Sequence, residues 1–146
     1  MRALNTVRLQ VQSRSVNEGY TRVAVSAFAA QLDPTVEEIS DIRTAVSEAV
    51  TNCIVHAYPG VVGTIYMTVS VYENGLIKIK IRDKGVGIPN IKQAMEPLFT
   101  TLGGERSGLG FSVMESFCDK VRVTSHPGRG TAVTLYKQIA GRNGDG

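Results

Sequence analysis

Apolar residues recur every three or four positions in two segments near the start of the chain. This spacing predicts two amphipathic helices, each with one apolar stripe. The first helix is expected to begin at Ser15 and to end at Asp33-Pro34, because proline disfavours the right-handed helical conformation in the residue before it. The second is expected to begin at Thr35 and to end at Tyr58-Pro59-Gly60. The expected stripes are Val16, Tyr20, Val23 and Ala27 in the first helix, and Val36, Ile39, Ile42, Val46, Val50, Cys53 and Ala57 in the second.

Both helices start with the sequence pattern of a capping box, a Ser or Thr followed three residues later by Glu. The first is Ser15-Val16-Asn17-Glu18 and the second is Thr35-Val36-Glu37-Glu38. In a capping box the hydroxyl and the carboxylate each accept a hydrogen bond from a backbone N–H that the first turn leaves unpaired. We therefore expect side-chain caps at both helix starts.

Most of the remaining chain alternates between apolar and polar residues, which predicts strands. The expected strands are 6–11, 64–72, 76–82, 121–125 and 131–136, with an Asn74-Gly75 hairpin turn between the second and third. A short helix is possible at 91–95, and an apolar helical run begins at Phe111. This order predicts an α+β two-layer sandwich, in which helices cover one face of a mainly antiparallel, mixed sheet.

Length and composition fit one folded domain, expected over residues 1–140, with a Gly-rich tail at 141–146 that is expected to be disordered. The net charge is +3, but no run of Lys or Arg is present and aromatic residues are sparse, so we expect no direct contact with nucleic acid. No apolar run approaches about 18 residues, so we expect neither a membrane span nor a signal peptide. Cys53 and Cys118 lack metal-site spacing and are expected to be buried, reduced thiols of a cytoplasmic protein.

Two polar residues of the second helix, Glu48 and Asn52, lie four positions apart and so share a face away from the apolar stripe. Taken alone, the pair fits a solvated surface or the wall of a site. Asp83-Lys84-Gly85-Val86-Gly87 follows a strand. It fits a tight turn, or a pocket where a flat ring approaches the glycines and the carboxylate accepts a hydrogen bond from an exocyclic amine.

Two more glycine motifs follow in the sequence. Gly108-Leu109-Gly110 precedes a helix, where free N–H groups favour phosphate, and Arg106 stands two residues earlier as a solvated cation or a phosphate clamp. Gly128-Arg129-Gly130-Thr131 fits a hairpin turn. Each motif is weak by itself, and their fixed order along the chain is the stronger observation.

This order resembles the Bergerat-type ATP-binding fold shared by gyrase, Hsp90, histidine kinases and MutL. Within that group, the segments SEAVTNCIVHAY, RDKGVGI, EPLFTT and ERSGLGFSVMESF resemble the anti-sigma F factors of spore-forming bacteria, a family of small serine kinases. The likeness extends from about residue 17 to about residue 134. At residues 102–104 the chain has Leu-Gly-Gly where close relatives carry bulkier or charged residues.

The resemblance implies a role for each matching residue. Glu48 would be the general base, and Asn52 would hold the Mg²⁺ that bridges the phosphates of ATP or ADP. Asp83 would bind the adenine amine, with Gly85 and Gly87 shaping that pocket and Thr131 near the base. Residues 88–107 would form a lid over the nucleotide. The expected phosphate contacts of that region are Arg106, Ser107, Gly108 and Gly110.

The resemblance also implies partners. Glu18 and Arg22 match positions that bind both sigma factor F and a STAS-type anti-anti-sigma protein, which is the kinase substrate, although Arg22 also fits an ordinary surface side chain. A homodimer is implied, through the first helix and the sheet edge. His56 matches the family pattern and is expected to be structural.

Three other functions remain open from the residues alone. One is an ATP-gated sigma-binding module without useful phosphotransfer, since only the proposed role of Glu48 separates that function from a kinase. Another is the general-stress homologue, which would share the same motifs. An orphan histidine-kinase domain ranks low, because the two histidines, His56 and His126, lie in the nucleotide helix and in a turn.

Overall fold

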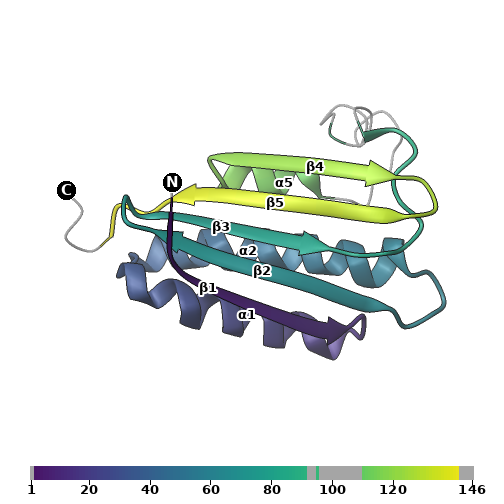
Figure 1. The fold of residues 1–146 in the computed structure, drawn as a ribbon, viewed down its shortest axis with the longest axis horizontal. Helices are drawn as coiled ribbons and strands as arrows, with labels where there is room; N and C mark the ends of the chain where they lie inside the picture. The colour runs from purple at the N-terminus through teal and green to yellow at the C-terminus, as the bar shows by residue number, and fades with distance from the viewer. Residues whose placement is uncertain (1, 92–94, 96–109, 142–146) are drawn as a thin grey trace.

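The computed structural model describes residues 2–91, 95 and 110–141. Five strands form one sheet in the order β1-β2-β3-β5-β4, and every neighbouring pair among them is antiparallel (Figure 1). The strands are β1 (Ala3–Gln12), β2 (Thr64–Tyr72), β3 (Leu76–Arg82), β4 (Lys120–His126) and β5 (Gly130–Gln138). The hairpin predicted at Asn74-Gly75 is confirmed, with Gly75 at φ 87° and its N–H donating to the Tyr72 carbonyl.

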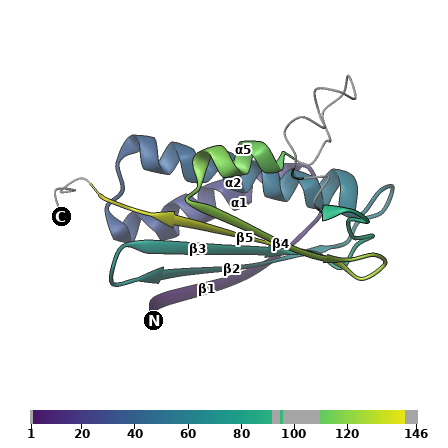
Figure 2. The same cartoon turned by 90° about the horizontal axis from the view of Figure 1, so that it is seen from above.

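In the part of the chain that the structure describes, three α-helices lie on one face of this sheet, and none lies on the other face (Figure 2). They are α1 (Val16–Ala29), α2 (Val36–Asn52) and α5 (Phe111–Phe117). The predicted α+β two-layer sandwich is confirmed. Alternate residues of β2 and β3 are buried under the helices, as the period-two pattern requires. Among the described residues, no helix is long and apolar enough to cross a membrane.

The central helix, α2, has α1 on one side and α5 on the other. Most of its predicted stripe is buried, with Ile42, Val46 and Val50 at most 1% exposed. Val36 is the exception at 82% exposed, because it lies in the first turn, beyond the packed part of the helix. A π-helical turn, η2 (Cys53–Ala57), continues α2 and ends at Tyr58, close to the predicted stop.

The stripe predicted for α1 is wrong. Val16, Tyr20 and Val23 are between 56% and 77% exposed, whereas Thr21 and Val25 are buried together with Ala29. The helix therefore has two neighbouring stripes. The stripe of Thr21, Val25 and Ala29 faces the sheet and α2, and the predicted stripe faces outward. A short 3-10 turn, η1 (Ala30–Leu32), follows, and the segment ends at Asp33 in a left-handed conformation (φ 51°).

Only one of the two predicted capping boxes forms. The Thr35 hydroxyl accepts from Glu38 N–H at 3.1 Å, and Glu38 Oε1 accepts from Thr35 N–H at 2.9 Å. Ser15 makes no side-chain cap within the described part of the chain, because its backbone is already helical (φ −57°, ψ −33°). The Glu18 carboxylate instead pairs with Arg22 Nε at 2.9 Å.

Glu38 also fastens the end of the chain to the start of α2. Its carboxylate accepts from the N–H groups of Ala140 and Gly141 at 2.7 and 3.2 Å. Partial burial raises the pKa of Glu38, but the hydrogen bonds from Thr35, Ala140 and Gly141 outweigh it and lower the pKa below its ordinary value. One carboxylate thus joins residues about a hundred positions apart.

Several predictions fall on residues 92–94, 96–109 and 142–146, which lie outside the described part of the chain. These are most of the short helix at 91–95, most of the lid, the sites Arg106, Ser107 and Gly108, and nearly all of the tail. The two cysteines are free, as predicted, with Cys53 buried and Cys118 half-buried.

Candidate nucleotide-binding site

A cavity of about 180 Å³ opens between the end of α2 and the sheet, next to the turn between β4 and β5. Four of the residues proposed from the sequence line it: Asn52, Asp83, Gly87 and Thr131. The other lining residues are mostly apolar, as suits a flat heterocycle, and comprise Ala49, Cys53, His56, Ala57, Ile81, Ile88, Pro89, Phe111 and Val133.

Asp83 is the buried polar residue of this cavity, at 6% exposed. Its Oδ1 accepts two backbone hydrogen bonds, from Gly85 N–H at 2.9 Å and from Thr131 N–H at 3.1 Å. Its Oδ2 accepts the thiol of Cys53 at 3.6 Å, a weak donor. Oδ1 is therefore occupied by strong donors, and Oδ2 keeps the capacity to accept a hydrogen bond from an amine in the cavity.

The turn after β3 is held between two neighbouring backbone segments. A Cβ on Gly85 would collide with the Ala57 carbonyl at the end of η2, and one on Gly87 (φ 79°) would collide with the His126 carbonyl. Val86 N–H donates to Ala57 O at 3.0 Å. Gly85 thus permits close backbone packing, whereas Gly87 also lines the cavity.

The β4–β5 turn places Thr131 at the cavity. Gly130 (φ 116°) allows this approach, because a Cβ there would collide with the Asp83 carbonyl. Thr131 O accepts from Asp83 N–H at 2.9 Å, and the Thr131 hydroxyl lies 2.8 Å from the Ser125 hydroxyl. The glycine motifs around residues 85 and 130 therefore meet in space and hold Asp83 from both sides.

The two polar residues predicted to share a face of α2 lie one helical turn apart. Asn52 ends α2 and lines the cavity, whereas Glu48, one turn earlier, is not among the residues that line it. A Cβ on Gly110 would collide with Glu48 Oε2, so the carboxylate lies directly against Gly110, the last residue of the Gly108-Leu109-Gly110 motif. Gly110 is left-handed (φ 63°) and immediately precedes α5. The acid, the amide and the described end of that motif are thus neighbours.

The residues present are compatible with a magnesium ion that also binds phosphate. The described residues contain no cluster of three or more His, Cys, Asp or Glu side chains suited to a metal. Mg²⁺ is commonly held by one or two protein oxygens together with substrate phosphates. The amide of Asn52 would hold the ion, and the ion would then neutralise phosphate charge. Such an ion would therefore be held only together with bound nucleotide.

The chain matches the model of the histidine kinase-like ATPase domain over residues 11–137. It is 53% identical over 140 residues to the anti-sigma F factor of Caldanaerobacter subterraneus subsp. tengcongensis, covering 95% of this chain and 96% of that protein. It is 50% identical over 137 residues to the anti-sigma F factor of Geobacillus thermodenitrificans, covering 93% and 94%. The chain belongs to the anti-sigma F factor family.

A solved structure gives the same fold at much lower identity. The RsbU and RsbW domains of a Mycobacterium tuberculosis protein match with a TM-score of 0.67 at 18% identity, over 92% of this chain and 32% of that one. The family model and this shared fold agree that the chain is a histidine kinase-like ATPase domain. The resemblance noted in the sequence is confirmed.

Some residues of the cavity were missed or misread from the sequence. His56 was expected to be structural, but it is exposed and lines the cavity. Its spacing of four from Asn52 was a usable signal, because residues 48, 52 and 56 share one helix face. Cys53 was assigned only to the apolar stripe, yet burial and the neighbouring Asp83 carboxylate raise its pKa well above the ordinary value. Its thiol therefore stays protonated and able to donate to Asp83.

The two expected partner-binding residues lie away from the cavity, on α1. Glu18 and Arg22 form an i,i+4 ion pair whose paired atoms are shielded from solvent. Arg22 and Glu48 line the same hollow between α1 and α2. The hollow that Arg22 lines therefore extends to Glu48, one helical turn before Asn52 of the cavity.

Proposed function

We propose that this protein is an ATP-dependent serine kinase that also binds sigma factor F. It would hold the sigma factor in the cytoplasm while ATP is bound, and it would phosphorylate a STAS-type anti-anti-sigma protein on serine. The observation that carries the proposal is the position of Glu48. Glu48 lines the hollow that reaches Arg22, its carboxylate lies against Gly110, and it stands one helical turn before Asn52, which lines the cavity.

In this proposal the adenine amine donates to Asp83 Oδ2, with the ring between the apolar walls of the cavity. The phosphates extend toward Asn52 and Gly110. Mg²⁺ held by Asn52 would neutralise phosphate charge when nucleotide is bound. Arg106, Ser107 and Gly108, which precede Gly110 in the chain, are proposed as further phosphate contacts.

The transfer itself needs one proton acceptor. The serine Oγ of the partner attacks the γ-phosphorus, the bond from that phosphorus to the β–γ bridging oxygen breaks, and ADP leaves. Glu48 takes the hydroxyl proton. Phosphoryl transfer depends mainly on positioning and charge neutralisation, so a carboxylate one helical turn from the metal-binding amide fits this role.

The partner serine would approach along the hollow between α1 and α2. This hollow has a volume of about 520 Å³ and runs from Arg22 to Glu48, with the hydroxyl groups of Ser40, Thr44 and Ser47 along it. A loop of the anti-anti-sigma protein would therefore meet Arg22 before its serine reaches the base.

The test uses γ-labelled ATP and the anti-anti-sigma protein as acceptor. Glu48→Gln should lower transfer by roughly 10²–10⁴-fold, the usual contribution of a general base, while the affinity for a fluorescent ATP analogue changes little. Glu115→Gln, an exposed acid on α5, is the matched control and should transfer normally. Unimpaired transfer by Glu48→Gln would remove the proposed role of that residue.

The rival function is an ATP-gated sigma-binding module. It predicts that ATP promotes binding of the sigma factor, yet labelled phosphate never reaches the anti-anti-sigma protein even with the wild-type chain. A pull-down with candidate sigma factors separates sigma factor F from a general-stress sigma factor. The proposed homodimer is tested by light scattering at several concentrations, and a persistent monomer would contradict it.

A further inference from the structure

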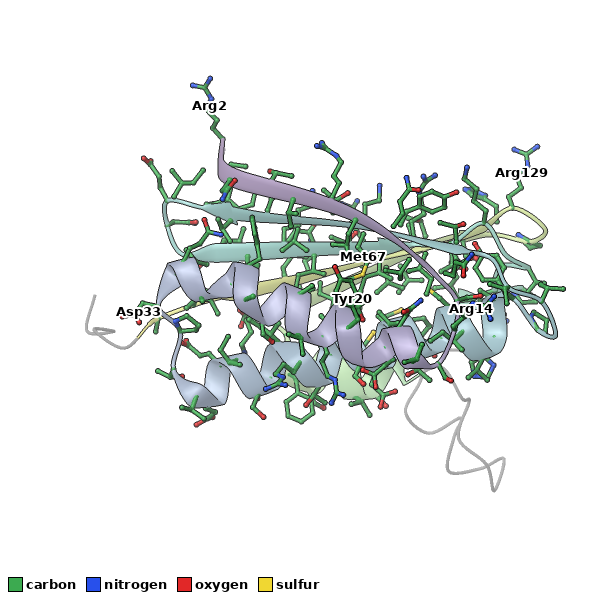
Figure 3. All side chains as sticks on the ribbon, turned by 90° about the horizontal axis from the view of Figure 1, so that it is seen from below. Arg2, Arg14, Tyr20, Asp33, Met67 and Arg129 are labelled. Atoms are coloured by element: carbon green, nitrogen blue, oxygen red, sulfur yellow. The ribbon has the colours of Figure 1, made fainter. Side chains whose placement is uncertain are left out.

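The open face of the sheet gathers positive charge. Six basic residues project from this face along three strands, with one more directly after β3 and another in the β4–β5 turn. We call this set the cationic face, and it consists of Arg8, Lys78, Lys80, Arg82, Lys84, Lys120, Arg122 and Arg129. Figure 3 shows nitrogen-tipped side chains on the side of the sheet opposite the helices, with Arg129 labelled at one end.

No carboxylate balances these charges on the sheet. None of the five strands contains an Asp or a Glu. Within the described residues the two ion pairs are Arg22–Glu18 and Lys137–Asp41, and neither involves the cationic face. A one-signed surface of this kind creates a field that concentrates anions and accelerates their binding.

Two tyrosines lie among the basic side chains. Arg82 and Lys84 sit over the Tyr66 ring at 4.8 and 4.9 Å from its centroid. Lys78 and Lys120 sit over the ring of Tyr136 at 5.9 and 5.6 Å. Strand register fixes both clusters, since Tyr66 pairs with Arg82 across β2 and β3, and Tyr136 pairs with Lys78 and Lys120 across β3, β5 and β4.

Lys80 lies at the centre of this surface. It lines three separate hollows, which together extend from Arg8 in β1 to Arg129 in the β4–β5 turn. Hydroxyl groups of Thr68, Thr124 and Thr134 line these hollows as well. Lys, Arg, Thr and Tyr side chains are the groups that contact the phosphates of nucleic acid.

An acidic protein partner fits this face less well. The core of a protein interface is apolar and depleted in charged residues. The strongly exposed large apolar side chains of the described chain lie on the helices and loops, apart from Leu4 at the start of β1. Aromatic rings set among basic groups are instead typical of surfaces that bind single-stranded nucleic acid, where bases stack and phosphates pair with the cations.

We propose that the cationic face binds single-stranded nucleic acid, with Lys78, Lys80, Arg82 and Arg122 on the phosphates and bases stacked on Tyr66 and Tyr136. This site lies on the opposite side of the sheet from the helices and is independent of the proposed kinase function. It departs from the expectation that the chain makes no direct contact with nucleic acid. That expectation rested on the absence of a Lys/Arg run, and the strands create a basic surface without one.

The test measures binding of fluorescein-labelled 20-nucleotide DNA and RNA single strands, and of the matching duplex, by fluorescence anisotropy. Neutralising about four phosphates should weaken single-strand binding roughly 50-fold between 50 and 200 mM KCl. Lys80→Glu should weaken binding at least tenfold at 50 mM and reduce the salt dependence. The matched control is Arg14→Glu, which makes the same charge change outside the cationic face and should stay within twofold (Figure 3).

Two further arms complete the test. Tyr66→Leu together with Tyr136→Leu should weaken single-strand binding while leaving duplex binding unchanged. Circular dichroism and ATP binding check that each variant is folded. The proposal is overturned by no binding at 50 mM KCl, by equal losses in Lys80→Glu and Arg14→Glu, or by duplex binding as tight as single-strand binding. Equal competition by polyglutamate of matched length would also overturn it, in favour of an acidic protein partner.

Discussion

The helices α1 and α2 start from similar sequence patterns and reach different structures. Each begins with a Ser/Thr-x-x-Glu pattern and carries an apolar stripe. In α2 the capping box forms and most of the stripe is buried, whereas in α1 Ser15 does not cap and Val16, Tyr20 and Val23 face outward. Position in the fold explains the difference. Helix α2 lies on the sheet with α1 on one side and α5 on the other, whereas α1 lies on the sheet with only α2 beside it among the described helices.

A local sequence pattern determines which faces of a helix could be buried, and the neighbouring elements determine which of those faces is buried. The buried side of α1 includes Thr21, whose hydroxyl donates to the Glu18 carbonyl at 2.8 Å and so needs no partner in the core. This leaves the larger apolar residues exposed next to the Glu18–Arg22 ion pair. An exposed apolar stripe beside a charged pair suits a surface that binds a protein.

The largest expected difference between the two helices is in the free energy of unfolding after truncation of one valine on each. Val46→Ala should lower the free energy of unfolding by roughly 2–3 kcal/mol, because it removes two methyl groups from a buried position and leaves a cavity. Val23→Ala should change it by less than about 0.5 kcal/mol. Urea denaturation measures both, and a dilution series removes any contribution from association. Equal losses would mean that the exposed stripe of α1 is packed in solution.

The next largest expected difference is between Glu38 of α2 and Glu18 of α1, again in the free energy of unfolding. Glu38→Ala should cost about 1–2 kcal/mol, because it removes a cap and the bonds to residues 140 and 141. Glu18→Ala should cost about 0.5 kcal/mol or less, because its i,i+4 partner Arg22 has a side chain that is 41% exposed. Since the folded state lowers the pKa of Glu38, its contribution is complete above the ordinary value of 4.5 and is lost as the pH falls through the folded value.

Denaturation at pH 6 and pH 3 measures this dependence. The difference between wild type and Glu38→Ala should be largest at pH 6 and smaller at pH 3. A difference that grows on acidification would contradict the assigned direction of the pKa shift.

The two capping positions should differ by about 1 kcal/mol. Thr35→Ala removes a formed cap and should cost about 1 kcal/mol. Ser15→Ala removes a hydroxyl that makes no cap in the described structure and should be close to neutral. Thermal unfolding of the pair in one buffer is sufficient. A loss in Ser15→Ala equal to that in Thr35→Ala would show that the first box forms in solution.

The smallest expected effect on stability is that of truncating Tyr20 on the exposed side of α1, which should nevertheless weaken binding of a protein partner. Tyr20→Ala, at a side chain 59% exposed, should leave the unfolding midpoint within about 1–2 °C and weaken binding of the sigma factor or of a second copy. Val61→Ala, an exposed loop position, is the control for surface truncation. Calorimetric titration with the sigma factor and light scattering give the two readouts. Unchanged binding in Tyr20→Ala would remove α1 from the partner surface.

Sequence patterns alone predicted part of the geometry of the candidate site. The spacing of Glu48 and Asn52 placed them on one face, and the glycine motifs marked the turns that meet at Asp83. The sequence could not predict the hydrogen bond from the Cys53 thiol to Asp83, because that contact joins η2 to the turn after β3, thirty positions apart in the chain. Nor could it supply the π-helical turn after Asn52, because packing between the end of α2 and the turn after β3 has no local signal.

The sequence by itself determined the elements of this protein, since hydrophobic period, proline, glycine and turn residues act within a few positions of one another. It also determined the family, through motifs in a fixed order. The tertiary structure decided which stripe of α1 is buried, which capping box forms, and that scattered lysines and arginines gather on one face of the sheet. Those outcomes depend on strand register and on which surfaces cover one another, and contacts between distant residues decide both.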